Sequence, residues 1–202
     1  MTLVRAISAG DAATASRLLA ESPGLAKERV ENGATRQLSN PYYLKEISHY
    51  VYAGDTALHI AAAAYQPQIA RQLIAVGADV RARNRRGAEP LHYAADGAPG
   101  SPSWNPHAQV AIIANLIEAG ANPNAVDQSG VMPLHRAVRT RCASAVSALL
   151  DGGADPRSKN KSGSTPMKLA NQNTGRGGSG SAESKAQQEE IVRLLQQRGA
   201  AR

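Results

Sequence analysis

The chain has 202 residues, of which 42% are apolar and 19% are charged, a composition that excludes a disordered polymer and a membrane-embedded protein. No run approaches the ~18 consecutive apolar residues that a spanning helix needs, and Arg5 and Asp11 interrupt the N-terminus too early for a signal peptide. A single cysteine, Cys142, excludes an intramolecular disulfide framework and a cysteine-based zinc site, so we expect a reducing, cytoplasmic compartment.

Aromatic content and charge are both unusual. The chain has no Phe, one Trp and six Tyr, so it cannot build one large aromatic core and must bury apolar surface in another way. Its formal net charge of +7 favours an acidic protein surface, nucleic acid or an anionic membrane as the partner. Arg outnumbers Lys among the basic residues, which points weakly to a bacterial source.

A repeated motif organises the chain from residue 54 onward. Its copies begin with glycine and are GDTALHIAAA at Gly54, GAEPLHYAAD at Gly87, GVMPLHRAVR at Gly130 and GSTPMKLANQ at Gly163. A second marker, Gly-Ala-Asp or a close variant, recurs in phase at residues 77, 120, 153 and 199. The period is 33 residues, with insertions of 10 and 13 residues.

Each copy predicts a tight turn followed by two helices. Glycine tolerates positive φ in the turn, and residues such as Thr56 and Pro90 suit a helix start. The second helix carries an apolar stripe at helical spacing, for example Ile69, Leu73 and Ile74. Stacked units would bury these stripes in a thin continuous core, which a chain without Phe can build.

The T-P-L-H-x-A-A helix start and the L-L-x-x-G-A-D close, at this period, resemble the ankyrin-repeat family over essentially the whole chain. The resemblance implies an all-α solenoid of about five repeats in a single domain, residues 1–202, with hairpin turns projecting to one side. It also implies a non-catalytic module that binds another protein through its hairpin turns and the concave face of its helices.

The N-terminal residues 1–31 form a degenerate unit that keeps the Ala6, Gly10, Leu18 and Leu19 spacing but lacks the T-P-L-H start. We interpret it as an N-terminal cap, because a terminal repeat has only one neighbour to pack against.

About 22 residues beyond the period follow, at 32–53. This insert contains four of the six tyrosines, namely Tyr42, Tyr43, Tyr50 and Tyr52. Tyrosine buries a large area at low entropic cost and keeps a hydroxyl for bonding, as binding hot spots require. Two readings remain open: the rings contact a partner, or they pack the insert against the cap.

Basic residues gather in the turns of the repeats. The candidate contacts are Arg81, Arg83, Arg85 and Arg86 in one turn, Arg157 and Lys159, with Lys161, in a later turn, and Arg136 and Arg139, with Arg141, at helix starts between them. The resemblance places these charges along the side that meets partners, which predicts an acidic protein partner; the alternative is a solvated rim. Nucleic acid is the second candidate partner, less favoured because the tyrosines lie elsewhere in the sequence.

Two further insertions interrupt the repeats. The loop near 98–107 holds three prolines and Trp104, which either contacts a partner or, as we favour, holds the loop against adjacent helices. The segment near 174–186 is Gly/Ser-rich and predicts a disordered linker. The last helix should begin near residue 187, and its polar Gln196 is typical of a C-terminal cap.

Three histidines invite a metal interpretation. His59, His92 and His135 occupy the same slot of successive repeats, so they should stand ~8–10 Å apart, too far to converge on zinc at ~2.0–2.1 Å. The resemblance instead implies a structural role that bridges adjacent units. Cys142 has no base at a recognisable spacing and is expected to be an inert surface or half-buried thiol.

The Gly-rich segment lacks the preceding strand and closing G-K-[ST] of a phosphate loop. The sequence therefore predicts no catalytic, metal or cofactor site and no small-molecule substrate or membrane partner.

Overall fold

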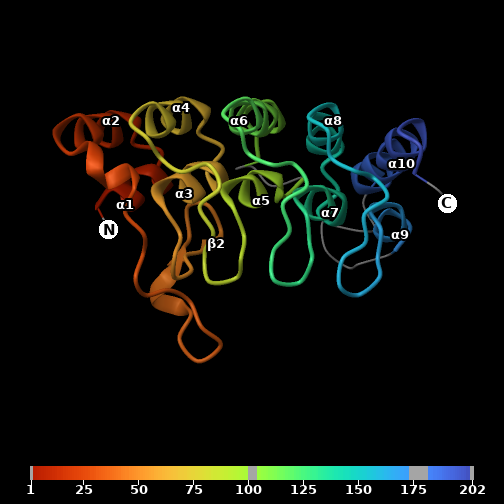
Figure 1. The fold of residues 1–202 in the computed structure, drawn as a ribbon, viewed down its shortest axis with the longest axis horizontal. Coiled ribbons are helices and arrows are strands. Elements are labelled where there is room, and N and C mark those ends of the chain that lie inside the picture. The colour runs from red at the N-terminus through yellow and green to blue at the C-terminus, as the bar shows by residue number, and fades with distance from the viewer. Residues whose placement is uncertain (1, 100–103, 173–181, 201–202) are drawn as a thin grey trace.

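The structure, a computed structural model, describes residues 2–99, 104–172 and 182–200. Its helices form two parallel rows, joined repeat by repeat (Figure 1). The inner row consists of α1 (Thr2–Ser8), α3 (Ala57–Ala63), α5 (Pro90–Ala95), α7 (Pro133–Arg139) and α9 (Pro166–Ala170). The outer row consists of α2 (Ala12–Glu21), α4 (Pro67–Ala75), α6 (Pro106–Glu118), α8 (Ala143–Asp151) and α10 (Ala182–Gln197). The predicted all-α solenoid is confirmed.

The core is a thin layer of side chains between the two rows of helices. Each helix packs against its neighbours in the same row and against its partner in the other row. Alanines such as Ala61 and Ala94 are fully buried on the inner helices, and larger residues such as Leu73 and Leu116 are fully buried on the outer ones. Because alanine has almost no side chain, adjacent inner helices approach closely and close the core without large aromatic rings.

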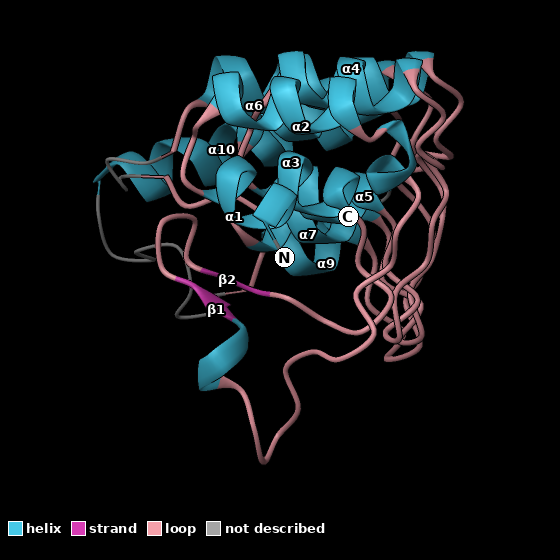
Figure 2. Ribbon diagram, turned by 90° about the vertical axis from the view of Figure 1, so that its left-hand side faces the viewer, coloured by secondary structure: helices cyan, strands magenta, loops and turns pink. Residues whose placement is uncertain are grey.

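The hairpins of successive repeats stack in register on one side of the solenoid (Figure 2). Their backbones are joined by one recurring hydrogen bond, from Arg85 N to Ala53 O at 2.7 Å, Gln128 N to Arg86 O at 2.9 Å and Lys161 N to Ser129 O at 3.0 Å. Gly130 shows why glycine opens the motif: its φ is +70°, and a Cβ there would lie 2.9 Å from the backbone N of Lys161.

The three repeated histidines connect neighbouring units, as the resemblance implied. In each, Nδ1 accepts a hydrogen bond from the backbone N–H three residues earlier, at 3.1–3.2 Å. In each, Nε2 lies 3.0–3.1 Å from a carbonyl of the next repeat, from His59 to Ala88, His92 to Val131 and His135 to Ser164. Burial lowers the pKa of His59 and of His92 to about 4, so the rings are neutral and Nε2–H donates.

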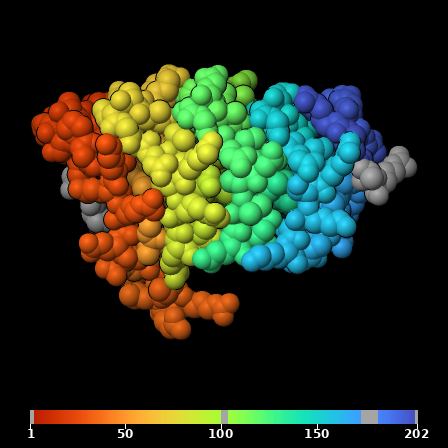
Figure 3. Space-filling model, viewed as in Figure 1, coloured from red at the N-terminus to blue at the C-terminus, as the bar shows by residue number. Residues whose placement is uncertain are grey.

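The insert leaves the stack at Val30 and returns at Gly54. The two ends pair through hydrogen bonds from Val30 N to Asp55 O at 2.8 Å and from Gly54 N to Val30 O at 2.7 Å. The cap before it ends in a 3₁₀ turn, η1 (Pro23–Ala26). The insert contains a second one, η2 (Asn40–Tyr42), and an antiparallel pair that the repeat pattern does not predict, β1 (Tyr43–Leu44) and β2 (His49–Tyr50). It extends below the inner helices (Figure 2) and projects from the body of the molecule (Figure 3).

The C-terminal helix begins earlier than predicted. Helix α10 starts at Ala182 rather than near residue 187, so the prediction of a disordered linker is wrong for residues 182–186. Ala182, Glu183 and Lys185 are good helix formers, and Ser184 is buried against the stack. Residues 174–181 of the predicted linker lie outside the described residues. No helix within the described ranges is long and apolar enough to span a bilayer.

Candidate protein-interaction surface

The tyrosines of the insert divide into two kinds. Tyr43 and Tyr50 face each other across the strand pair, with ring centroids 4.8 Å apart, and are 41% and 37% exposed. Tyr42 and Tyr52 are half-buried and pack against the core. Tyr42 and Tyr52 therefore hold the insert against the stack, and the strand pair presents an exposed aromatic patch.

The rest of the insert is fixed to the inner helices. Leu44 and Val51 are buried, and the His49 ring lies 4.4 Å from the ring of Tyr93 on α5. The Tyr93 hydroxyl donates to the buried Asp55 carboxylate at 2.9 Å, at the point where the insert rejoins the stack. Burial raises the pKa of the Asp55 carboxyl. These contacts hold the strand pair across the inner-helix side of the repeats that start at residues 54 and 87.

The basic hairpin at 81–86 contacts the insert directly. The guanidinium carbons of Arg85 and Arg86 lie 5.5 and 5.0 Å from the centre of the Tyr52 ring. Arg86 Nη1 also donates to the Tyr52 hydroxyl at 3.1 Å, and Arg85 donates to the carbonyl of Ala34. Two segments that the sequence places about a repeat apart therefore form one continuous surface.

Several of the basic side chains have structural bonds as well. Arg81 Nε donates to Gly120 O at 2.8 Å, and Arg157 Nε donates to Gly199 O at 3.0 Å. Both are exposed and occupy the same position of their repeats, so each connects its repeat to the next one. Arg83 donates to Gly87 O at 3.1 Å and to the carbonyl of Val126. Lys159 is exposed on the last hairpin.

Arg136 does not belong to the candidate surface. Its Nη1 is 2.8 Å from Asp96 Oδ2, its Nη2 is 3.2 Å from Asp127 Oδ2, and its side chain is 11% exposed. The guanidinium therefore neutralises two carboxylates within the stack. Arg139 lies half-buried at the end of α7.

Arg141 is also removed from the surface, being only 1% exposed. Its two terminal nitrogens donate to Ala170 O at 2.8 Å and Gln172 O at 2.6 Å, where they cap the end of α9. From the sequence, a basic residue near a helix start is expected to lie at the surface. The backbone of the turn, in which Arg141 has a φ of +62°, instead directs its side chain into the stack.

Trp104 packs against the stack, and residues 100–103 of its loop lie outside the described residues. The indole is half-buried against the core, and Nε1 donates to Gln109 Oε1 at 2.9 Å. This arrangement matches the structural role that the sequence favours. Cys142 is fully buried, not exposed or half-buried as expected, and burial raises the pKa of its thiol to about 12. Within the described ranges, His, Cys, Asp and Glu side chains do not gather in a group able to hold a metal ion.

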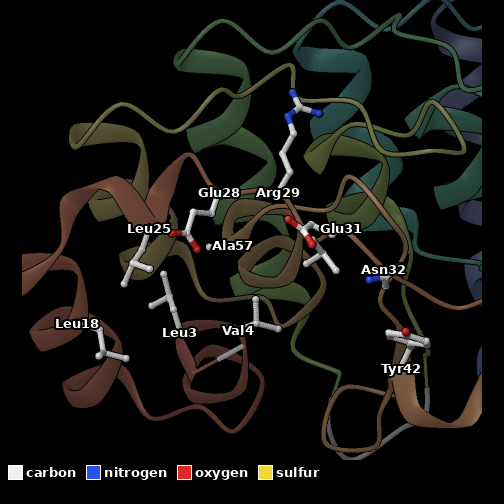
Figure 4. A pocket seen from close by; sticks show the side chains of 11 residues that line it. Leu3, Val4, Leu18, Leu25, Glu28, Arg29, Glu31, Asn32, Tyr42 and Ala57 are labelled. Atoms are coloured by element: carbon white, nitrogen blue, oxygen red, sulfur yellow. The ribbon is translucent and has the colours of Figure 1, made fainter.

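A groove of about 870 Å³, for which the sequence carries no repeated signal, lies at the N-terminal end of the solenoid. Apolar side chains of the cap, among them Leu3 and Leu18, lie at one end and Tyr42 of the insert at the other, with Glu28 and Glu31 between them (Figure 4). The groove exists because the insert stands away from the cap, which only its fold reveals.

Comparisons with known proteins agree with this architecture. A model of three ankyrin-repeat copies matches residues 3–101, one of many copies matches residues 116–170, and a single-repeat model matches residues 86–128. Similar proteins include the E3 ubiquitin-protein ligase KEG of Arabidopsis thaliana, 40% identical over 98 residues, which are 46% of this chain and 5% of the ligase. Ankyrin repeat and SOCS box protein 16 of Mus musculus is 38% identical over 117 residues, 58% of this chain and 25% of that protein. Tyrosine-protein kinase Shark of Drosophila melanogaster is 34% identical over 120 residues, 59% of this chain and 12% of the kinase.

The chain thus matches a quarter or less of the length of each of these relatives. What they share with it is the repeat, which in general is a non-catalytic interaction module. With the sequence motif, the stacked helix pairs and the matches over residues 3–170 in agreement, the chain belongs to the ankyrin-repeat family and is a protein–protein interaction module.

Proposed function

We propose that this module binds a protein partner with an acidic surface, and that the partner contacts the insert and the basic hairpin together. The observation that carries the proposal is the joining of these two segments at Tyr52, which lies beneath Arg85 and Arg86. The insert that holds this ring also carries the exposed Tyr43–Tyr50 pair, and the hairpin carries four exposed arginines.

The two halves of this surface would contribute differently. Exposed tyrosines supply apolar area and a hydroxyl at low entropic cost, and so contribute to affinity. Arginines at the rim attract an acidic partner over longer distances and act mainly on the association rate. Arg157 and Lys159 on the last hairpin extend the positive field along the same side. We place this interaction in the cytoplasm, in keeping with one reduced thiol.

The proposal is tested by comparing three immobilised proteins in extracts of the source cell. Wild type should retain a partner, identified by mass spectrometry, that Tyr43→Ser/Tyr50→Ser retains weakly. Arg83→Gln/Arg86→Gln should bind the same partner with slower association and a flatter salt dependence. Arg71→Gln, an exposed arginine on the outer helix α4, serves as the matched control and should behave like wild type.

Nucleic acid is the competing outcome. If the arginines bind phosphates, affinity for duplex or single-stranded DNA should fall by about 10³–10⁵ between about 50 and 200 mM salt for 6–10 phosphate contacts. If a protein is the target, generic DNA should bind weakly at about 0.15 M salt, where the Debye length is about 8 Å. Tight, salt-sensitive DNA binding with no dependence on Tyr43 and Tyr50 would contradict the proposal.

A further inference from the structure

The groove at the N-terminal end of the solenoid is separate from the surface proposed above. Its volume of about 870 Å³ lies near the upper end of the range of about 300–1,000 Å³ for ligand pockets, so it can take several side chains. Every residue that lines it belongs to the described ranges, and the exposed Tyr43–Tyr50 pair and the hairpin at 81–86 do not line it. The insert contributes only Asn32 and Tyr42, at one end (Figure 4).

The rest of the groove is an apolar wall that comes from the cap and the residues just after it. Leu3 and Val4 of α1, which are 6% and 7% exposed, form its floor. Leu18 of α2, Leu25 of η1 and Val30 are half-buried at its sides. Because this apolar surface is concave and continuous, apolar side chains that fill it are removed from water, which favours binding.

The charged side chains beside this wall lie in opposite directions. Arg29 extends away from the groove toward the basic hairpin (Figure 4), where its Nη1 donates to Arg83 O at 2.9 Å. Glu28 and Glu31 remain along the edge of the groove (Figure 4) and are exposed. Neither carboxylate forms a hydrogen bond or an ion pair within the part of the chain that the structure describes. In a chain with a formal net charge of +7, this groove therefore has a negative edge, which favours a cationic ligand over an anionic one.

We propose that the groove binds an amphipathic segment of a protein partner in which leucine-like side chains alternate with lysine or arginine. The apolar side chains pack over Leu18 and Leu25, and the basic side chains pair with Glu28 and Glu31. The methylene stems of lysine and arginine also fit an apolar wall with a charged edge. The proposal goes beyond the proposed function, because the two sites select ligands of opposite charge. Either proposal can therefore fail while the other holds.

Nuclear magnetic resonance of the full chain can both measure and locate this binding. Two short probe peptides of leucine, lysine and serine place the leucines either at helical spacing or at alternate positions. At least one should shift the methyl signals of Leu18, Leu25 and Val30 in a saturable way, with a dissociation constant on the order of 0.1 mM. The ring signals of Tyr43 and Tyr50 should stay unchanged.

The contribution of each half of the groove is tested separately. Replacing the lysines of the probe by glutamates, or its leucines by serines, should abolish saturation. Glu28→Gln/Glu31→Gln should weaken the binding of the leucine–lysine probe about five- to tenfold, as expected for the loss of two exposed ion pairs. Glu118→Gln/Glu189→Gln changes two exposed carboxylates of α6 and α10. This control alters the net charge equally and should bind like wild type, and urea unfolding should show that both variants are as stable as wild type.

Several results would overturn the proposal. Equal saturation by the glutamate peptide would show that the groove selects no charge. Shifts of Tyr43 and Tyr50 with the same dissociation constant would move the site to the strand pair. Methyl signals of the groove that shift with protein concentration alone would show that a second copy of the chain fills it. Lack of saturation by either lysine peptide, or unchanged binding in Glu28→Gln/Glu31→Gln, would also contradict it.

Discussion

In the repeat stack, equivalent residues of successive repeats make the same hydrogen bonds, whereas each contact of the N-terminal insert is made only once. The histidine slot gives the same pair of hydrogen bonds in three successive repeats. The insert is held by single, unrelated contacts: His49 against Tyr93, Arg86 on Tyr52 and Arg85 on Ala34. The stack is therefore stabilised cooperatively along its length, while the insert can change without breaking the stack.

The first prediction concerns a single substitution in the stack. His92→Leu leaves the buried N–H of Glu89 without its partner and removes one of the two hydrogen bonds to Val131 O, which keeps the one from the Asp127 N–H. The free energy of unfolding should therefore fall by about 1–3 kcal/mol in urea denaturation. His107→Leu, the same substitution at an exposed position of α6, should change it by no more than about 0.5 kcal/mol. Equal effects of the two substitutions would show that the histidine slot is not structural.

The second prediction concerns acid. Burial lowers the pKa of His59 and His92 to about 4 and also lowers that of His135, whereas the unfolded histidines titrate near pH 6.5. Between these values the unfolded chain binds more protons, so stability should be complete above about pH 6.5 and decline toward pH 4, by up to about 1.4 kcal/mol per pH unit for each histidine.

Two carboxyls act in the opposite direction. Burial raises the pKa of Asp55 and of Glu89, so these groups take up protons more readily in the folded chain and soften the decline at the acid end. Urea unfolding at a series of pH values from 7.5 to 4 measures the combined effect of the histidines and the carboxyls on the free energy of unfolding. A profile that is flat or rises toward acid would contradict the assignment of neutral buried histidines.

The structure of the repeat stack could be predicted from the sequence, whereas that of the insert could not. The period predicted the helix pairs and the positive-φ glycines, and the family resemblance implied the histidine bridges, because a bond made in every repeat leaves its residues at a fixed spacing. Features that occur once have no repeated spacing by which to recognise them. These are the strand pair of the insert, the contact of Arg86 with Tyr52 and the burial of Arg141. For Tyr43 and Tyr50 the sequence could only leave two readings open, because exposure depends on which face of a single hairpin meets the stack.

The third prediction is smaller and local. Arg86→Gln removes the contact with Tyr52, worth about 0.5–1 kcal/mol at an exposed site. Hydrogen exchange at the amides of Ala34 and Val51, which bond within the insert at 2.7 and 2.8 Å, should become about two- to fivefold faster. Exchange in the inner helices should stay as in wild type, and Arg71→Gln should have no effect on either. If Arg86→Gln accelerates exchange throughout the stack, insert and stack are one cooperative unit.

The most direct test of the central claim compares binding and stability in one variant, Tyr43→Ser/Tyr50→Ser. Because both rings are exposed, the free energy of unfolding should change by no more than about 0.5 kcal/mol. Affinity for the partner retained by wild type should fall by about 2 kcal/mol or more, roughly 30-fold, mainly through faster dissociation. The contrary result is a variant that unfolds markedly earlier yet binds normally per folded molecule; the insert would then be part of the cap, and Trp104 and Arg139 would become the next residues to test.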